Sequence, residues 1–334
     1  MYMNNPQSLP SLDGQRVMIT GGLGFIGSNL ARRCVDLGAS VTVYDCLDTQ
    51  SGGNIHNISD IENEIEIVAD DIRNFEAVCR CVRGQDIVFH CAGYTSHPQS
   101  MREPIANIDV NCKGTLHLLE ACRRFNPDAR FVHVGTSTQI GRMLHNPVDE
   151  CHPEFPLDIY SCNKAVTEKY VLIYANAHAL DATVVRFANV FGPRSHIRTS
   201  EFGFVNFFVG LGLQQKDITV FGDGRQLRTL TYVDDCVSSL ILASRSESSR
   251  GEVFFAVADN QLAVGDIAKA IVQHVGGKLR QVDWPKDRAA IEVGDAVISN
   301  KKIKCLLGWS PRCDLASGLI ATKEYFAPRL AHYL

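Results

Sequence analysis

VMITGGLGFIG, at residues 17–27, is the stretch from which the organisation of this chain is best understood. The apolar run ends at Thr20, and Phe25, Ile26 and Leu30 then recur at helical spacing. This pattern predicts a β-strand, a glycine-rich turn and the first residues of an α-helix.

Gly21, Gly24 and Gly27 have separate roles in such a turn. One permits the tight turn, one lets the backbone approach a phosphate group without a Cβ in the way, and one lets the helix pack close to the strand. The amide groups at the start of the helix would then face a diphosphate. Standing alone, the pattern would fit an ordinary glycine-rich turn equally well, so the rest of the chain has to support it.

Length and composition are those of a soluble globular protein. The chain has 334 residues, 45% hydrophobic and 21% charged, which is enough for one large or two coupled domains. The formal net charge is −4 and the basic residues are scattered, so the sequence indicates no basic surface for binding nucleic acid or an anionic membrane. Residues 1–10 are polar and no apolar run reaches membrane-spanning length, so we expect a cytoplasmic protein without membrane contact.

The twelve cysteines fall mostly within apolar segments and form no C-x-x-C pair, which favours buried, reduced thiols. Potential metal ligands crowd together at one place, between His145 and His152. Pro147 and Pro153 mark that segment as an ordinary loop, and no second ligand group has recognisable spacing. We therefore expect no metal site.

Strands and helices alternate over the first 190 residues. After the first strand and a helix ending near Leu37, we expect strands at 40–44, 65–69, 86–89, 130–134 and 182–187, and helices at 75–82, at 104–124 and from an N-cap at Asp158. This alternation predicts an α/β, Rossmann-like, doubly wound parallel sheet. Beyond Asn189 the rhythm changes, which indicates a smaller second α/β domain, with returns to the sheet near 231–243 and 253–257.

Asp45 follows the second predicted strand. A carboxylate at this place accepts hydrogen bonds from the adenosine ribose and repels the 2′-phosphate that distinguishes NADP, so NAD is the expected cofactor. The alternative is a solvated turn aspartate. The fourth strand runs into His90, which we expect to be structural, and then into Cys91, Ala92 and Gly93, whose small size lets a cofactor lie against the backbone.

Tyr160 and Lys164 lie four residues apart, so on a helix they share one face. A phenol titrates near pH ~10, but a neighbouring ammonium and an oxidised nicotinamide both favour its anion, which would make Tyr160 a base near neutral pH. Thr136, at the end of the adjoining strand, is placed to hydrogen-bond the same substrate oxygen. The Tyr-x-x-x-Lys spacing alone also occurs by chance on solvated helix surfaces.

Together these features resemble, in order and spacing, the extended short-chain dehydrogenase/reductase family, and more narrowly its nucleotide-sugar epimerases and dehydratases. Residues 20–27 are similar to the family's T-G-x-x-G-F-I-G signature, and 71–73 resemble its adenine-side motif. The resemblance continues through an N-x-x-G-T at 111–115, an R-x-x-N-V-x-G-P-R at 186–194, and the segments 222–228 and 307–309. It covers about the whole chain.

The resemblance implies a site for NAD and a nucleotide sugar, with Thr136, Tyr160 and Lys164 as catalytic residues. The residues that it assigns to NAD are Gly21, Gly24, Phe25, Ile26, Gly27, Asp45, Asp71, Ile72, Cys91, Ala92, Gly93, Asn111, Tyr160 and Lys164. Those that it assigns to the substrate are Thr136, Asn189, Phe221, Arg228 and Arg288. Arginines offer forked donors to phosphate and an aromatic ring stacks on a base, although Arg288 fits an ordinary surface position equally well.

The expected domains follow from these assignments. Residues 1–188 plus 229–258 would form the NAD-binding Rossmann domain, and 189–228 plus 259–334 the nucleotide-sugar-binding domain. Family members usually dimerise through the helices that correspond to 104–124 and 158–177, so a homodimer is expected from the resemblance.

The reaction that fits best is reversible epimerisation of a nucleotide sugar, a UDP-sugar by this resemblance, at C4. The segment His90 to Gly93 resembles the H-x-A-G of UDP-galactose 4-epimerases, as does its spacing to Ser100 and Pro104. Ser137 and Thr138 stand where the family's 4,6-dehydratases carry Asp and Glu, so the acid and base of a dehydration are missing there.

Other readings remain open from the sequence. Related decarboxylases usually keep a glutamate at the position of Thr138, so they fit less well. The family's Y-G is Ile140-Gly141 here, and the serine before the catalytic hydroxyl is Gly135, which leaves the substrate undetermined. The alternatives are an enzyme that acts at another carbon, an enzyme that forms a stable 4-keto product, and a non-catalytic sensor that binds NAD and a sugar nucleotide.

Overall fold

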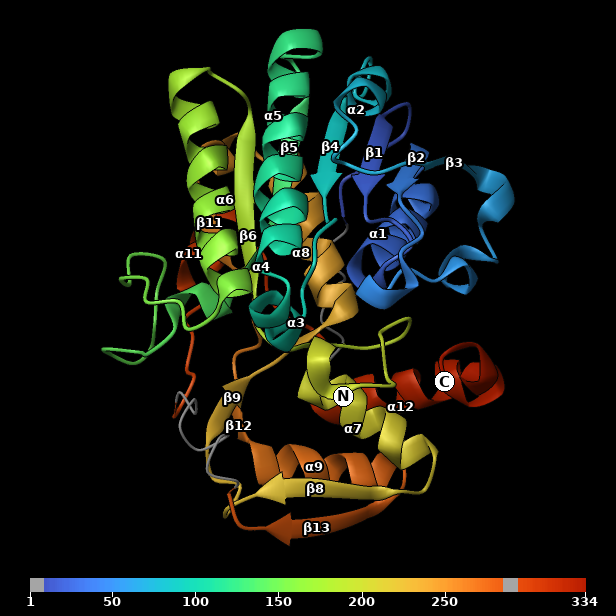
Figure 1. The fold of residues 1–334 in the computed structure, drawn as a ribbon, viewed down its shortest axis with the longest axis vertical. Helices are drawn as coiled ribbons and strands as arrows, with labels where there is room; N and C mark the ends of the chain where they lie inside the picture. Colours follow the sequence, from blue (N-terminus) through green and yellow to red (C-terminus); the bar gives the residue numbers. More distant parts are fainter. Residues whose placement is uncertain (1–8, 285–293) are drawn as a thin grey trace.

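A seven-stranded parallel sheet forms the centre of the protein in the computed structural model, which describes residues 9–284 and 294–334 (Figure 1). Its strand order is β11-β6-β5-β4-β1-β2-β3. The strands are β1 (Arg16–Thr20), β2 (Ser40–Asp45), β3 (Ile65–Ala69), β4 (Ile87–His90), β5 (Arg130–Thr136), β6 (Ala182–Phe187) and β11 (Val253–Phe255). The order reverses between β1 and β4, and ligands of such sheets bind at this switch point. The predicted fold class is confirmed.

Helices cover both faces of the sheet, as Figure 1 shows. Helices α1 (Phe25–Asp36) and α8 (Val233–Arg245) share one core with Val17 and Ile19 of β1. Helices α2 (Phe75–Cys81), α5 (Gly114–Phe125) and α6 (Ile159–Ala177) share the other core with Met18. Successive residues of β1 thus serve opposite faces, as the pleat of a strand requires.

Two predicted elements differ in detail. The helix expected at 104–124 consists of α4 (Pro104–Ile108), a π-helical turn (Asp109–Lys113) and α5, and it is preceded by a short helix α3 (His97–Arg102) that the sequence pattern did not indicate. Of the two segments expected to rejoin the sheet, 253–257 supplies β11. The other segment, 231–243, does not join the sheet. It contains β10 (Thr231–Tyr232), which pairs in parallel with β7 (Val190–Phe191), and then helix α8, which packs on the surface of the sheet.

A smaller unit lies at one end of the sheet, at the bottom of Figure 1. It contains the parallel pair β8 (Asp217–Phe221) and β13 (Lys278–Val282), and the antiparallel pair β9 (Leu227–Thr229) and β12 (Gln261–Ala263). Helices α7 (Phe204–Leu213), α9 (Val264–His274) and α12 (Leu315–Phe326) complete it around a core of their own. Helix α11 (Lys301–Leu307) leads instead to the sheet layer, where Ile303 and Trp309 are fully buried.

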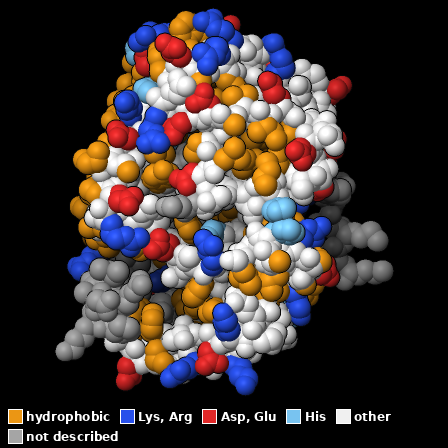
Figure 2. Space-filling model, turned by 45° about the vertical axis from the view of Figure 1, so that its right-hand side comes forward, with side chains coloured by type: hydrophobic (Ala, Val, Ile, Leu, Met, Phe, Trp, Pro, Cys, Tyr) orange, Lys and Arg blue, Asp and Glu red, His pale blue; other side chains and the backbone are white. Residues whose placement is uncertain are grey.

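The surface carries both signs of charge. On the face shown in Figure 2, acidic and basic side chains are interspersed among apolar ones. No helix in the described ranges is both long and apolar enough to span a bilayer. All twelve cysteines are free thiols.

Candidate active site

The glycine turn between β1 and α1 forms a close-fitting cradle. Gly21 has φ +68°, and a Cβ there would lie 2.7 Å from the Ala92 Cα, while a Cβ on Gly27 would lie 2.2 Å from the Gly21 carbonyl oxygen. Gly24 caps α1 without a side-chain hydrogen bond, and the first turn of α1 carries no acidic residue. Free amides in a neutral first turn suit an anion such as the diphosphate of NAD, so this part of the chain fits the expected cofactor.

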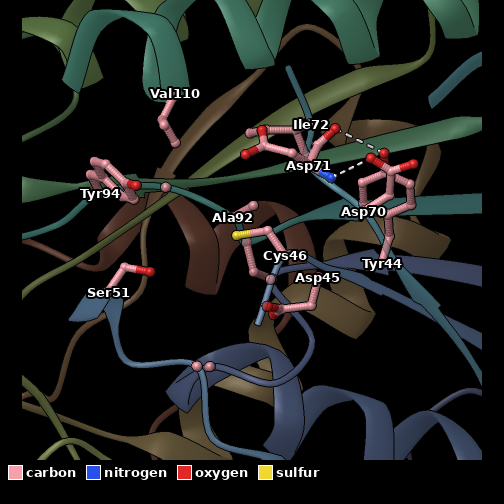
Figure 3. Close-up of a pocket in the computed structure, with 15 residues that line it drawn as sticks. Tyr44, Asp45, Cys46, Ser51, Asp70, Asp71, Ile72, Ala92, Tyr94 and Val110 are labelled. Carbon is pink, nitrogen blue, oxygen red and sulfur yellow. Dashed lines mark hydrogen bonds between the residues drawn. The ribbon is translucent and has the colours of Figure 1, made fainter. Parts of the chain in front are cut away.

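A small cavity beside this turn is formed by the ends of β2, β3 and β4 (Figure 3). Among its residues are Tyr44, Asp45, Ser51, Asp70, Asp71, Ile72 and Tyr94. Asp45 is buried and accepts hydrogen bonds from the amides of Leu23 at 3.0 Å and Leu47 at 2.9 Å. Burial raises the pKa of its carboxyl, an effect that these two hydrogen bonds partly offset.

Tyr44 and Asp70 shape the far wall of this small cavity. The Tyr44 hydroxyl donates to the carbonyl oxygen of Asp71 at 2.9 Å, and the Asp71 amide donates to the Asp70 carboxylate at 2.7 Å, as the dashed lines in Figure 3 show. The acidic groups of this cavity would repel a phosphate on the ribose, which agrees with NAD rather than NADP.

A larger cavity of about 410 Å³ continues from the small one and shares Gly21, Gly24 and residues 91–93 with it. Its volume lies within the usual range for ligand sites, ~300–1,000 Å³. The wall combines the turn of α1 with the ends of β4 and β5, the start of α6 and the segment from Ser200 to Asn206. Asn111, Thr136, Tyr160, Lys164 and Asn189 all line it. Residues from distant parts of the chain therefore meet in one cavity.

Tyr160 and Thr136 both line this cavity. Tyr160 is in the first turn of α6, whose N-cap Asp158 accepts a hydrogen bond from the Ser161 amide at 2.8 Å. Burial, with a smaller contribution from the Asp158 carboxylate, raises the pKa of Tyr160 to about 12, although the hydrogen bond with Thr136 acts in the opposite direction. The polypeptide alone thus holds Tyr160 as a neutral phenol at neutral pH.

Lys164 lies one turn further along α6, with its ammonium directed at β5. Its Nζ donates to the Val134 carbonyl oxygen at 2.6 Å and contacts the His133 Nε2 at 3.1 Å. Burial lowers the pKa of Lys164 to about 8. In the polypeptide without its cofactor, burial keeps the pKa of Tyr160 raised, and the expectation that the ammonium and an oxidised nicotinamide together favour its anion stays a prediction.

His90 and Asn111 brace the backbone around the cavity. Thr115 donates to the Asn111 carbonyl oxygen at 2.5 Å, so it accepts from His90 Nε2 at 2.9 Å, and Nδ1 then accepts from Thr20 at 2.8 Å. Burial, helped by the Lys164 charge, lowers the pKa of His90 to about 3, which keeps the ring neutral as this arrangement needs. The side chain of Asn111 makes two hydrogen bonds to the backbone of Tyr94: Oδ1 accepts from the Tyr94 amide and Nδ2 donates to the Tyr94 carbonyl oxygen, both at 2.9 Å. His90 is structural, as expected.

The residues assigned to the substrate are more widely spread. Asn189 lines the larger cavity, has φ +42° and donates to the Thr229 carbonyl oxygen at 3.1 Å. Phe221 lies at the end of β8, with its ring 5.5 Å from that of Trp284, and Arg228 on β9 donates to the Gly294 carbonyl oxygen at 2.7 Å. Both belong to the smaller unit and neither is among the residues that line the two cavities. Arg288 lies outside the described residues.

Comparison with known proteins agrees with this geometry. A model of the NAD dependent epimerase/dehydratase family matches residues 17–256. The chain belongs to this family. The predicted relationship and the predicted cofactor, NAD, are thereby confirmed.

Members of the NAD-dependent epimerase/dehydratase family with different reactions resemble this chain to a similar degree. A putative UDP-glucose 4-epimerase from Methanocaldococcus jannaschii is 28% identical over 304 residues, covering 91% of this chain and 95% of the relative. A dTDP-glucose 4,6-dehydratase from Streptomyces niveus is 30% identical over 322 residues, covering 93% and 92%. The structure of UDP-glucose 4-epimerase with UDP-glucose from Thermotoga maritima has a TM-score of 0.85 at 30% identity, covering 95% of this chain and 100% of that one.

Two residues beside the family's Tyr position were not recognised as part of the site from the sequence: His97 and Ser161. Helix α3, which begins at His97, places the imidazole ring on the wall of the larger cavity, edge-on to the Tyr160 ring at 5.0 Å between centroids. Asp158 had been recognised as an N-cap, but its contact with His97 joins residues 61 positions apart. No periodicity or motif in the sequence indicates such a contact.

In the loop from His145 to His152, where potential metal ligands crowd together, the His152 ring is hydrogen-bonded to the backbone. The rings of His145 and His152 lie 4.6 Å apart, but both nitrogens of His152 contact the backbone: Nδ1 the Pro153 carbonyl oxygen at 2.6 Å and Nε2 the Leu144 amide at 2.9 Å. Within residues 9–284 and 294–334, no group of three or more His, Cys, Asp or Glu side chains has the arrangement of a metal site.

Proposed function

We propose that this protein is a nucleotide-sugar 4-epimerase, with a UDP-sugar as its substrate, that works by transient oxidation at C4. One observation carries the choice among the family's reactions. Next to Tyr160, where a 4,6-dehydratase would need an acid and a base, the chain has Thr136, Ser137 and Thr138, and the hydroxyls of Thr136 and Thr138 lie 3.2 Å apart. Hydroxyls can orient a sugar but do not readily protonate a departing hydroxyl at C6.

In this proposal Tyr160 takes the proton from the C4 hydroxyl and later returns it, while Thr136 holds the same oxygen. When bound, NAD supplies the hydride acceptor and a positive charge that favours the Tyr160 anion. Lys164 acts in the proposal mainly by position, since its ammonium is fixed to β5 at the edge of the cavity. The cofactor residues are those proposed from the sequence, from Gly21 through Asn111.

The sugar-nucleotide end of the proposal relies on Asn189, Phe221 and Arg228, with Arg288 as a further candidate. Asn189 is the one nearest the chemistry, because it lines the larger cavity with Tyr160. Phe221 and Arg228 would receive the base and the diphosphate from the smaller unit. This arrangement corresponds to a division between an NAD-binding domain, 1–188 plus 229–258, and a sugar-nucleotide domain, 189–228 plus 259–334, which we also propose.

A homodimer and a cytoplasmic location complete the proposal. Large apolar side chains are exposed on helices α3, α4 and α6, where Met101 is 59%, Ile105 69% and Ile173 54% exposed. Burying these side chains in a helical interface would remove them from water. Free thiols throughout the chain suit a reducing compartment.

The deciding experiment is an NMR screen of the purified protein with catalytic NAD. UDP-glucose, UDP-galactose, UDP-glucuronate and their N-acetyl and dTDP counterparts are incubated separately. We expect an equilibrium mixture of C4 epimers without net NADH. A keto-sugar would identify a dehydratase, a pentose would identify a decarboxylase, and no conversion of any sugar would favour the non-catalytic sensor. Each of these outcomes contradicts the epimerase proposal.

A further inference from the structure

Three distant segments of the chain meet at the buried side chain of Asn57, which is 1% exposed and follows residues 51–53 on the wall of the two cavities. Its Nδ2 donates to the carbonyl oxygen of Leu23 at 2.9 Å and to that of Arg194 at 3.3 Å. Its Oδ1 accepts from the Tyr333 hydroxyl at 2.6 Å. One amide group therefore joins the glycine turn to two segments that lie far along the chain.

From this geometry we propose that Asn57 and Tyr333 are positioning residues of the cofactor site, which hold the glycine turn in the form that receives the diphosphate of NAD. The inference rests on the proposed cofactor role of this turn, and it is independent of the reaction at the sugar. It gives a role to the segment 325–334, none of whose residues lines either cavity.

Leu23 is the residue through which Asn57 acts on the turn. The Leu23 carbonyl oxygen accepts from the Asn57 side chain and, at 3.1 Å, from the Asn54 amide. The Leu23 amide donates to the Asp45 carboxylate at 3.0 Å. Hydrogen bonds therefore fix the peptide groups on both sides of Leu23. Because a peptide group is planar, the direction of this carbonyl also sets that of the Gly24 amide, at the N-cap of α1.

Tyr333 determines which way the Asn57 amide faces. The two backbone carbonyl oxygens can only accept, so they require the NH₂ group, and the remaining Oδ1 needs a donor. The Tyr333 hydroxyl is that donor, and its oxygen accepts in turn from the Tyr325 hydroxyl at 2.5 Å. Burial raises the pKa of Tyr333, so this hydroxyl keeps its proton at neutral pH. Without it, the buried Oδ1 would lose its partner, and the orientation of the amide would be less strongly fixed.

The segment 325–334 has further contacts beside Asn57. The Asn54 Nδ2 donates to the His332 carbonyl oxygen at 3.1 Å, and the rings of His56 and His332 lie 3.8 Å apart. These contacts do not involve the Tyr333 hydroxyl. A Tyr333→Phe variant can therefore test the hydroxyl without detaching the segment.

The test follows the release of bound dinucleotide from the full chain. The protein is loaded with NADH, excess NAD is added, and the fall in the fluorescence of bound NADH gives the dissociation rate. Tyr333→Phe removes one hydroxyl and keeps the ring, while Asn57→Ala removes the amide. Asn126→Ala is the matched control, because Asn126 Nδ2 also donates to two carbonyl oxygens, those of Val82 at 2.8 Å and Gln85 at 2.6 Å, and none of these three residues lines either cavity.

We expect Asn57→Ala to speed release about tenfold or more, and Tyr333→Phe about threefold to tenfold, the scale for loss of a buried hydrogen-bonding partner. The double variant should release NADH no faster than Asn57→Ala, because both changes act through one amide. Asn126→Ala should lower the melting temperature and leave the release rate unchanged. If Asn57→Ala does not fold, Tyr333→Phe and Asn126→Ala decide the question.

Three results would overturn the proposal: a wild-type release rate in Tyr333→Phe, additive effects in the double variant, or equally fast release from Asn126→Ala. Its failure and that of the proposed function are distinguishable, because the exchange needs no sugar. If Tyr333→Phe speeds release but no C4 epimers form in the NMR screen, the epimerase proposal is wrong and the positioning role stands. If epimers form and release is unchanged, only the positioning role is wrong.

Discussion

Tyr160 has two neighbours on the wall of the larger cavity: Thr136 lines the same cavity, and the His97 ring packs edge-on against the Tyr160 ring. Removing the hydroxyl alone should leave both the packing and the cavity in place. We therefore expect Tyr160→Phe to lower turnover at least about 100-fold, the usual scale for loss of a general acid–base group, with NAD affinity changed by less than about threefold.

Turnover by NMR and NAD binding by fluorescence titration check this prediction. Tyr170→Phe, on the same helix α6 and packed against the core, is the matched control and should retain activity. Full activity of Tyr160→Phe would exclude the proposed mechanism.

Asp45 is the second residue whose role can be measured directly. Its carboxylate lines the small cavity and is anchored by the Leu23 and Leu47 amides. Asp45→Ala should weaken NAD binding and shift the NAD-to-NADP affinity ratio towards NADP about tenfold, a change of ~1.4 kcal/mol, because a repulsive charge is removed. Titration of both dinucleotides, with Asp45→Asn to retain the shape, gives the ratio. An unchanged preference would mean that another group discriminates between the two cofactors.

At the scale of elements, β4 and β5 carry two neutral histidines side by side. The rings of His90 and His133 lie 5.1 Å apart, and burial lowers the pKa of both, that of His90 to about 3. The unfolded chain then binds more protons than the folded one between pH ~6.5 and pH ~3, so stability is full above this window and is lost as the pH falls through it.

We expect the free energy of unfolding to fall by about 1 kcal/mol per pH unit for each of these histidines below pH ~6. Denaturant titrations at several pH values between pH ~4 and pH ~7 measure the slope. His90→Asn should reduce the slope even though it also weakens the contacts to Thr20 and Thr115, whereas His178→Asn should not. Equal slopes in the wild type and His90→Asn would show that His90 is not the group that titrates.

For the whole molecule, the exposed apolar side chains of α3 and α4 belong to the surface that we propose as the dimer interface. Ile105→Glu replaces an apolar side chain that is 69% exposed with a charged one. A charge buried in the core of the proposed interface would oppose association, so the variant should be a monomer with half the mass of the dimer. Light scattering gives the mass. Leu279→Glu, on β13 in the smaller unit and 42% exposed, should leave the mass unchanged. A wild-type protein that is already monomeric would remove the proposal.

Sequence alone was sufficient for those features that depend on residues close together in the chain. The strand, turn and helix at 17–27, the parallel sheet and the common face of Tyr160 and Lys164 all follow from short-range spacing, and the structure has them. The π-helical turn at Asp109–Lys113 was missed because a single wider turn hardly changes the helical pattern.

Only the tertiary structure determined how these elements meet. His97 and Asp158 are brought together because α3 packs beside the start of α6, and Ser161 then joins them to Thr138 at the end of β5. Burial also decides the pKa of Tyr160, which rises to about 12 although a lysine lies four residues away, because the Lys164 ammonium is turned to Val134. Spacing along a chain fixes which side chains share a face, but solvent access and contacts between distant segments exist only once the segments are packed.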